Sequence, residues 1–267
     1  MNENVKWVAA AVGVVGVTVG GILYFSKIKK APKPVEAPVA TVPEPVPEPE
    51  AVPEDDIAHP LPQPEANQAM PSLDTSDAPM RAALEDLFGK RPVEQFLVPE
   101  DVIRHIVVTV DNLPNEKASE RLWPIKRTPG IFTVAGSEDA PVLDPSNYQR
   151  YNALVQTVRS TDTKVLVATY VRYYPLFQEA YENLGHPPEY FNDRVIQVID
   201  HLLETPDLEG EVALARPGMR YTYADPELEA RSAGQKVLMR MGSANAKAIK
   251  DKLRELRTEL LAMKPQA

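Results

Sequence analysis

Carboxylate, amide and imidazole side chains recur at helical spacing in one part of the second half of the chain. Asp193, Gln197 and Asp200 are four and three residues apart, so a helix would place them on one face. His201 lies one turn beyond Gln197 on the same helix. A preceding helix would carry three further polar side chains, at Gln178, Glu179 and Glu182. If the two helices pack antiparallel across the turn at 185–188, the two groups could converge on one site.

Two carboxylates that face each other across a bond could hydrolyse a glycosidic linkage. Such hydrolases use one carboxyl group as an acid and the other as a base or nucleophile. Glu179 or Glu182, paired with Asp193, would fit that requirement in an enzyme acting on cell-wall glycan. Charged residues at helical spacing are more often a solvated helix face, with Asp193 bonded to its own neighbours. The sequence therefore predicts no catalytic residue, and the group stays a candidate binding site.

Aromatic residues concentrate in the same two segments. Aromatic rings stack on sugars or anchor peptides, so Tyr173 and Tyr181 would belong to a ligand-binding groove if they are exposed. Helical spacing of aromatic residues more often marks the packing between two helices. We therefore expect an inter-helix core formed by Tyr170, Tyr173, Tyr174, Phe177, Tyr181, Tyr190 and Phe191.

Residue types and motifs exclude several other chemistries. The chain contains no cysteine, which rules out disulfides, thiolate catalysis and cysteine-based metal sites. Its four histidines lie in separate segments, without the HExxH-like spacing of a zinc site. The sequence has no P-loop, GxGxxG or Gly-x-Ser-x-Gly motif. We therefore predict neither a metal nor a cofactor.

The elements that would position these side chains are mostly helices. Apolar residues recur at spacings of three and four over much of residues 72–264, between proline, glycine and capping residues. Alternating residues around turns predict two short β-hairpins, over 131–143 and 212–223. We expect a mainly α (α+β) multi-helix globular domain, with helices over 77–88, 93–98, 102–113, 145–159, 162–184, 189–204, 225–242 and from 243 onward.

Particular residues are expected to begin or bend these helices. Ser76 or Asp77, Asp162 and Ser243 are predicted to cap helix N-termini. Pro175 predicts a kink in the longest central helix. The last helix has apolar residues at alternating spacings of three and four, but over less than three heptads. This favours packing onto its own domain rather than a coiled coil.

Residues 1–30 are predicted to anchor the chain in a membrane. Trp7–Phe25 is an uncharged run of nineteen residues, which as a helix covers roughly 28 Å, about one bilayer hydrocarbon core. A cleaved signal peptide would have a shorter apolar stretch and a small-residue cleavage site, whereas lysines follow here. Gly16 and Gly20 form a GxxxG pair on the same face as Gly13, which would permit a homodimer through the membrane helix. Small residues are also common in membrane helices without such a role.

Residues 31–71 are predicted to be a disordered linker rich in proline and glutamate. Repeated proline prevents helix and sheet and favours polyproline II, with a reach approaching roughly 120 Å. Recognition by a proline-binding module is the less favoured interpretation. The long linker favours a domain that lies in the periplasm and is tethered to the bacterial inner membrane. The excess of lysines after the anchor favours the alternative, a cytoplasmic domain.

The net charge of −9 is concentrated in the linker. Residues 31–71 contain eight acidic residues and only Lys33 as a base, whereas residues 1–30 are basic. The domain that follows is mildly acidic and lacks a broad basic surface for a phosphate backbone. We therefore do not expect nucleic acid as a partner.

Three stretches resemble a known family. They are residues 107–114 (VVTVDNLP), 174–203 (YPLFQEAYENLGHPPEYFNDRVIQVIDHLL) and 232–236 (SAGQK). They are similar to signature stretches of a bacterial family of domains of unknown function, the one numbered 3014, over residues 78–261. The resemblance implies a bacterial envelope protein with an N-terminal anchor and a proline-rich spacer. It implies no catalytic residue.

Taken together, the sequence predicts a membrane-tethered binding or scaffolding module of the bacterial cell envelope. Its partners would be the lipid bilayer, through residues 7–25, and another envelope protein or cell-wall glycan. The alternative is an envelope hydrolase that uses the carboxylates of the central helices.

Overall fold

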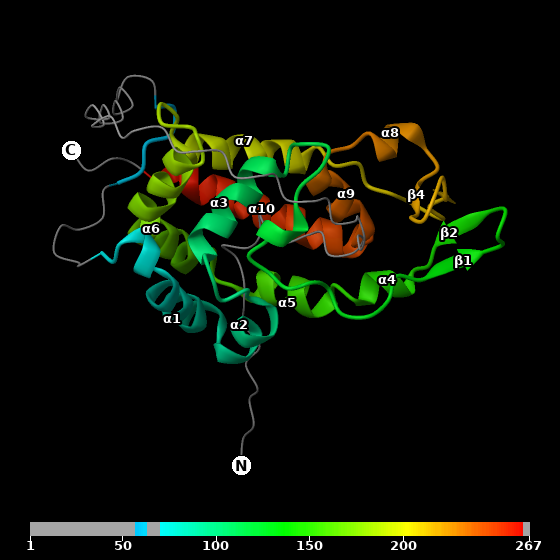
Figure 1. Ribbon diagram of the computed structural model, residues 1–267, viewed down its shortest axis with the longest axis horizontal. Helices are drawn as coiled ribbons and strands as arrows, with labels where there is room; N and C mark the ends of the chain where they lie inside the picture. Colours follow the sequence, from blue (N-terminus) through cyan, green and yellow to red (C-terminus); the bar gives the residue numbers. More distant parts are fainter. Residues whose placement is uncertain (1–56, 63–69, 264–267) are drawn as a thin grey trace, which may run out of the picture.

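The computed structural model describes residues 57–62 and 70–263, which are mainly helical with two small antiparallel strand pairs (Figure 1). Both expected hairpins are present: β1 (Val134–Gly136) pairs with β2 (Pro141–Leu143), and β3 (Leu214–Ala215) pairs with β4 (Thr222–Tyr223). Short 3₁₀ turns occur at η2 (Leu73–Thr75) and η3 (Glu120–Leu122). The helices are α1 (Asp77–Phe88), α2 (Lys90–Phe96), α3 (Val102–Asn112), α4 (Ser146–Gln149), α5 (Asn152–Ser160), α6 (Thr163–Asn183), α7 (Phe191–Leu203), α8 (Pro226–Glu229), α9 (Ala233–Arg240) and α10 (Ser243–Ala262).

The predicted membrane anchor, Trp7–Phe25, lies outside the described residues, as does most of the predicted linker. Within the part of the chain that the structure describes, no helix combines the length and the apolar character needed to cross a bilayer.

The main core lies between α3, α6, α7 and α10. Apolar faces of these helices meet, and their largest fully buried side chains include Tyr181, Phe177 and Leu253. The last helix packs on α5, α6, α7 and α9 of the same domain, as predicted. Its buried residues are Ala246, Ile249, Lys250, Lys252, Leu253, Leu256 and Leu260.

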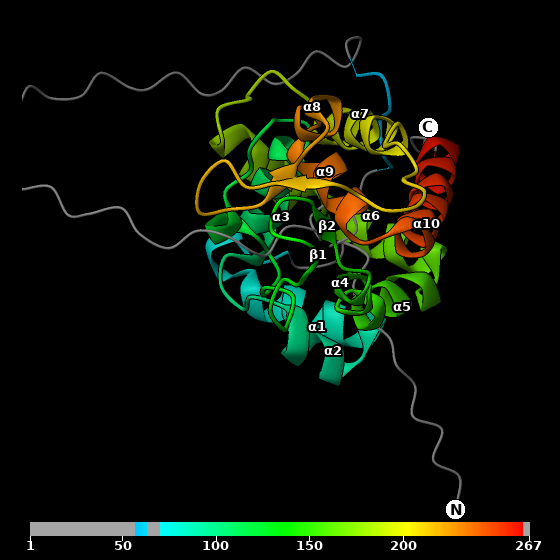
Figure 2. The same ribbon diagram turned by 90° about the vertical axis from the view of Figure 1, so that its right-hand side faces the viewer.

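The hairpins form a second, smaller core at one end of the long axis. Leu143 of β2 donates its amide hydrogen to the carbonyl of Val212 at 2.9 Å, which joins the two hairpins. Leu143, Val212, Leu214 and Tyr223 then pack with Met239 of α9. Figure 2 looks onto this hairpin end.

The prediction of one continuous helix over 225–242 is wrong, because residues 230–232 are not helical and separate α8 from α9. Ser232 caps α9 by accepting a hydrogen bond from the Gln235 amide at 3.2 Å. The first amides of α9, those of Ala233 and Gly234, donate to carbonyls just after α3, at 2.7 and 3.0 Å. These donors bind another element, so the helix cannot continue through them.

The predicted helix over 145–159 is also divided, into α4 and α5. The buried side chain of Asn147 accepts a hydrogen bond from the Thr133 amide at 3.0 Å and donates to the Thr133 carbonyl at 2.6 Å. These bonds hold α4 against Thr133, the residue that precedes strand β1, instead of in line with α5.

Three predicted helix starts differ in detail. The helix predicted over 93–98 begins earlier, at Lys90, with Pro92 in its first turn. The N-cap of α10 is Gly242 rather than Ser243; its φ is +80°, and an added Cβ would lie 2.6 Å from the Tyr148 ring. Neither Ser76 nor Asp77 caps α1 through its side chain. The Asp77 carboxylate instead accepts the amides of residues 101 and 102 at 2.9 Å, at the start of α3.

Candidate functional site

The end of α6, the turn after it and the start of α7 form the α6–α7 corner (residues 174–194). Helix α6 begins at its predicted cap, twelve residues before this corner. The Asp162 carboxylate accepts the amides of Lys164 and Val165 at 2.8 and 3.1 Å and so starts α6. The helix then runs through Pro175, whose ring is exposed, to Asn183.

Gln178 holds the corner together. Its Oε1 accepts hydrogen bonds from the Tyr174 hydroxyl at 3.0 Å and from the Phe191 amide at 2.9 Å. Its Nε2 donates to Glu182 Oε1 and to the Glu189 carbonyl, both at 2.9 Å. One half-buried amide therefore satisfies groups on α6, on the turn and on α7.

A second set of bonds ties the corner to the end of α3. The buried Tyr181 donates to Glu189 Oε2 at 2.8 Å, and its ring stacks on His186 with centroids 4.5 Å apart. The hydrogen bond from Tyr181 is the main reason that the pKa of Glu189 is lowered. Burial is the main reason that the pKa of Tyr181 is raised. Arg194 donates to both the carboxylate and the carbonyl of Asp111, at 2.9 and 2.7 Å.

Part of the predicted linker, residues 57–62, lies against this corner, and we call it the docked segment. Asp193 binds its main chain: Oδ2 accepts the Ala58 amide at 3.0 Å and Oδ1 accepts the His59 amide at 2.8 Å. The neighbouring Asn192, which is fully buried, donates to the His59 carbonyl at 2.8 Å. Two adjacent residues at the start of α7 thus bind three main-chain groups of the docked segment.

The docked segment also contributes to the core. The Leu61 amide donates to the Tyr190 hydroxyl at 3.1 Å, and the Leu61 side chain is buried with 6 % exposure among the main-core residues. The segment therefore combines main-chain recognition with one apolar anchor.

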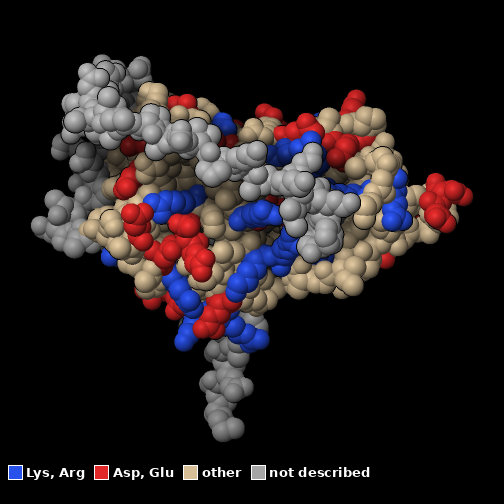
Figure 3. All heavy atoms as spheres, in the orientation of Figure 1, with Lys and Arg blue, Asp and Glu red and all other residues tan. Residues whose placement is uncertain are grey.

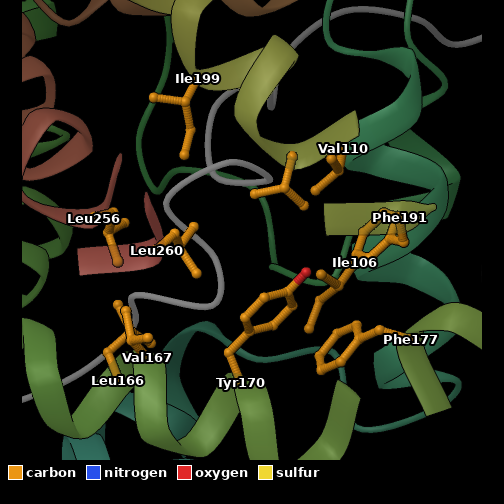
Figure 4. Close-up of a pocket in the computed structure, with 11 residues that line it drawn as sticks. Ile106, Val110, Leu166, Val167, Tyr170, Phe177, Phe191, Ile199, Leu256 and Leu260 are labelled. Atoms are coloured by element: carbon orange, nitrogen blue, oxygen red, sulfur yellow. The ribbon is translucent and has the colours of Figure 1, made fainter. Parts of the chain in front are cut away.

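An apolar cavity of about 50 Å³ lies beside the corner, between α3, α6, α7 and α10. Figure 4 shows Tyr170 reaching from α6 into the space among the labelled side chains. Its hydroxyl lies 3.4 Å from Asn192 Oδ1, and burial raises its pKa. Small-molecule sites are usually about 300–1,000 Å³, so this cavity is a packing gap rather than a ligand site.

The aromatic residues form the core that the sequence favoured. Tyr173 and Tyr181 are 5 % and 0 % exposed, so their rings are not available to stack on a ligand. The Tyr173 hydroxyl donates to the Pro79 carbonyl at 3.4 Å, which joins α6 to α1. Their interpretation as exposed binding residues is therefore wrong, and their role is to pack the helices.

The polar residues of α7 contact three different parts of the molecule instead of one site. Asp193 binds the docked segment. Asp200 accepts two hydrogen bonds from Arg257 of α10, at 2.6 and 3.1 Å. His201 Nε2 lies 2.8 Å from the Ser232 hydroxyl at the start of α9.

The remaining predicted residues lie on α6 and α7. Gln178 and Glu182 bond to each other, whereas Glu179 and Gln197 are exposed and form no hydrogen bond with the described residues. Within residues 57–62 and 70–263, no cluster of three or more His, Asp or Glu side chains could hold a metal ion.

The sequence reasoning missed Tyr190, Asn192, Glu189, Asp111 and Arg194. Only one signal pointed to this arrangement: Ile57 and Leu61 are the only isoleucine and leucine in residues 31–71.

The fold and the corner define a mainly helical domain that binds a segment of its own N-terminal linker. The family model described as "Protein of unknown function (DUF3014)" matches residues 102–257, from α3 to α10, which is more than half of the chain. The chain therefore belongs to this family, as the signature stretches suggested. No curated protein and no solved structure matches it.

Proposed function

We propose that this protein is a membrane-tethered binding module of the bacterial cell envelope. Its linker is attached at the α6–α7 corner, and its hairpin end engages a partner. The observation that carries the proposal is the docking of residues 57–62 on Tyr190, Asn192 and Asp193. A tether gains a defined exit point from the domain by this contact.

The position of the docked segment gives the tethered domain a direction. In Figure 1 the segment lies at the α6–α7 end of the long axis, and the hairpins lie at the opposite end. A domain tethered at its α6–α7 end would present its hairpin end away from the anchor.

The hairpin end carries the two most exposed large apolar side chains among the described residues. Ile131 is 86 % exposed and Met219 is 94 % exposed. They flank Phe132 and Tyr221, whose ring centroids are 6.1 Å apart. Large apolar side chains exposed at one end of the domain favour contact with another molecule, here an envelope protein or cell-wall glycan.

The alternative function, a glycan hydrolase, has less support from the corner. Glu182 is bonded to Gln178, and both oxygens of Asp193 accept main-chain amides of the docked segment. A catalytic Asp193 would have to release that segment first. Binding therefore accounts for these carboxylates with fewer assumptions.

Site-specific photo-crosslinking of the full chain in bacterial cells tests the binding role. A photoreactive residue at position 131 or 219 should give a defined adduct with an envelope component. The matched control is Val165 of α6, a side chain with 52 % exposure away from the hairpins, which should give none. Adducts from position 165 alone would contradict the proposal.

The absence of native cysteine makes the membrane side directly testable. A single cysteine in place of Ala51, in the linker, should react with a membrane-impermeant maleimide in cells whose outer membrane has been permeabilised. The full chain should also stay in the membrane fraction after alkaline extraction. Labelling only after lysis of the inner membrane would place the domain in the cytoplasm.

A further inference from the structure

A cavity of about 490 Å³ lies between the segment that follows α3, the start of β4 and helix α9. We call it the arginine cleft, because arginine is its most frequent charged residue. Its cationic side chains are Lys117, Arg121, Arg127, Arg220, Lys236 and Arg240. Figure 3 shows basic side chains gathered across the middle of this face, over the segment after α3.

Only half of these cations have an acidic partner. Lys117, Arg127 and Lys236 pair with Glu116, Glu120 and Glu229, at 3.9, 3.2 and 3.5 Å respectively. Among the residues that the structure describes, these three glutamates are the only acids that line the cleft. In the described part of the chain, no hydrogen bond or ion pair involves the other three cations, Arg121, Arg220 and Arg240.

Arg220 carries the strongest sign of a missing ligand. Its Nη2 is buried and has no hydrogen-bond partner within the described residues. An unsatisfied buried donor is destabilising, and more so when it is charged. An anion bound in the cleft would remove that cost, because a guanidinium group donates in a planar fork that matches an oxyanion.

We propose that the arginine cleft binds a small molecule that carries phosphate groups. Three uncompensated guanidinium groups from three elements suit a compact anion with more than one charge. The hydroxyl of Ser119, which also lines the cleft, can donate to a further phosphate oxygen. The volume is that of a small-molecule site, and the acidic domain does not suit a nucleic-acid polymer. This site is separate from the docked segment and does not depend on the tether.

Binding of inorganic pyrophosphate to the full chain in neutral detergent tests the proposal by calorimetry at about 50 mM NaCl. One pyrophosphate should bind per chain, and affinity should fall as salt is raised. Arg220→Gln and Arg121→Gln should each weaken binding about tenfold, the effect of one charged hydrogen bond. The matched control is Arg159→Gln on α5, an exposed arginine outside the cleft, which should bind like the wild type.

Thermal unfolding separates loss of the site from loss of the fold. Arg220→Gln removes an unsatisfied charge, so the variant should unfold at or above the wild-type temperature. Pyrophosphate should raise the unfolding temperature of the wild type but not of Arg220→Gln, by mass action on the folded state. No heat and no shift at about 10 mM pyrophosphate would overturn the proposal. So would an equal loss of binding in Arg159→Gln.

Two competitors distinguish the ligand class. A hexaglutamate peptide should bind more weakly than pyrophosphate, and phosphatidylglycerol added to the micelle should not displace pyrophosphate. Tighter, Arg220-dependent binding of the peptide would show that the cleft takes an acidic peptide. Displacement by the lipid would show that it takes a lipid headgroup. Either outcome overturns the small phosphate ligand and leaves the tether experiments unaffected.

Discussion

The Asp193 carboxylate binds main-chain amides of the docked segment, so this one contact does not depend on which side chains the segment carries. Both carboxylate oxygens accept hydrogen bonds from amides, those of Ala58 and His59. The adjacent Asn192 donates a hydrogen bond to the carbonyl of His59. Charge-assisted hydrogen bonds of this kind are about twice as strong as neutral ones. Asp193 therefore accepts two of the four hydrogen bonds that hold residues 57–62 on the other described residues.

Asp193→Ala is expected to release the docked segment without unfolding the domain. Hydrogen exchange of the amides of Ala58, His59 and Leu61 should accelerate to the rate of a solvent-exposed chain. Stability should fall by about 1–3 kcal/mol, because the amides lose a charged acceptor. Gln197→Ala, at an exposed position of the same helix, is the control and should leave exchange unchanged. Unchanged protection in Asp193→Ala would contradict the role of the carboxylate.

His201 makes stability depend on pH. Burial is the largest cause that lowers its pKa below the ordinary value of 6.5. The unfolded chain therefore takes up a proton first as pH falls, and stability decreases from about pH 6.5 downward. Urea unfolding between about pH 5 and 8 should show this decrease in the wild type and a flatter profile in His201→Gln.

Ser232→Ala separates titration from loss of the hydrogen bond. This variant loses the contact between His201 and Ser232 and the cap of α9, so it should be less stable at every pH. It should nevertheless keep the slope below pH 6.5, since the imidazole is still there. A flat profile in Ser232→Ala would mean that the slope does not come from burial of His201.

At the scale of elements, the helices were predictable where a local signal was sufficient. Asp162 caps α6 as expected, and the periodic apolar residues of α3, α7 and α10 match their observed spans. The breaks before α5 and α9 were not predictable. They depend on the side chain of Asn147 and on the carbonyls of Leu113 and Asn115, which come from other parts of the chain.

The close approach of α9 to the end of α3 requires glycine at position 234. A Cβ added there would lie 2.6 Å from Leu202 Cδ2 and 3.2 Å from Leu113 Cβ. Gly234→Ala should therefore lower the free energy of unfolding by about 1–3 kcal/mol, the usual cost of overpacking. Chemical denaturation measures this loss. Gly218→Ala, with no atom within 4 Å of the added Cβ, is the control and should stay within about 0.5 kcal/mol of the wild type.

The candidate site was only partly predictable because its residues act through contacts distant in sequence. Gln178 and Asp193 were identified from their spacing on helices. Their partners, including Ala58 and Glu189, could not be assigned from periodicity. Spacing places residues on one face of a helix, but the neighbouring elements decide what each residue of that face contacts.

At the scale of the whole molecule, the proposed membrane tether and the docked segment together predict how the domain would stand relative to a bilayer. Single cysteines in place of Leu184, at the α6–α7 corner, and Met219, at the hairpin end, can carry a fluorophore, since both positions are exposed. A quencher attached to lipid headgroups should reduce the fluorescence at position 184 more than at 219.

The same comparison in Asp193→Ala tests whether docking causes the difference. Without the docked segment the domain should rotate freely about a longer linker, so quenching at the two positions should become similar. Equal quenching in the otherwise unchanged protein would show that docking does not orient the domain.

The docked segment also determines how the protein would respond to a pulling force between the membrane and a bound partner. The force would first load the few hydrogen bonds of Ala58, His59 and Leu61, before it reached the helices that contain the main core. Rupture of those bonds would free residues 57–62 and extend the reach of the domain by at most about 20 Å, the contour length of six residues. The domain itself would stay folded. A protein that bridges two layers of an envelope could in this way follow a change in their separation and recover its shorter length when the load is removed.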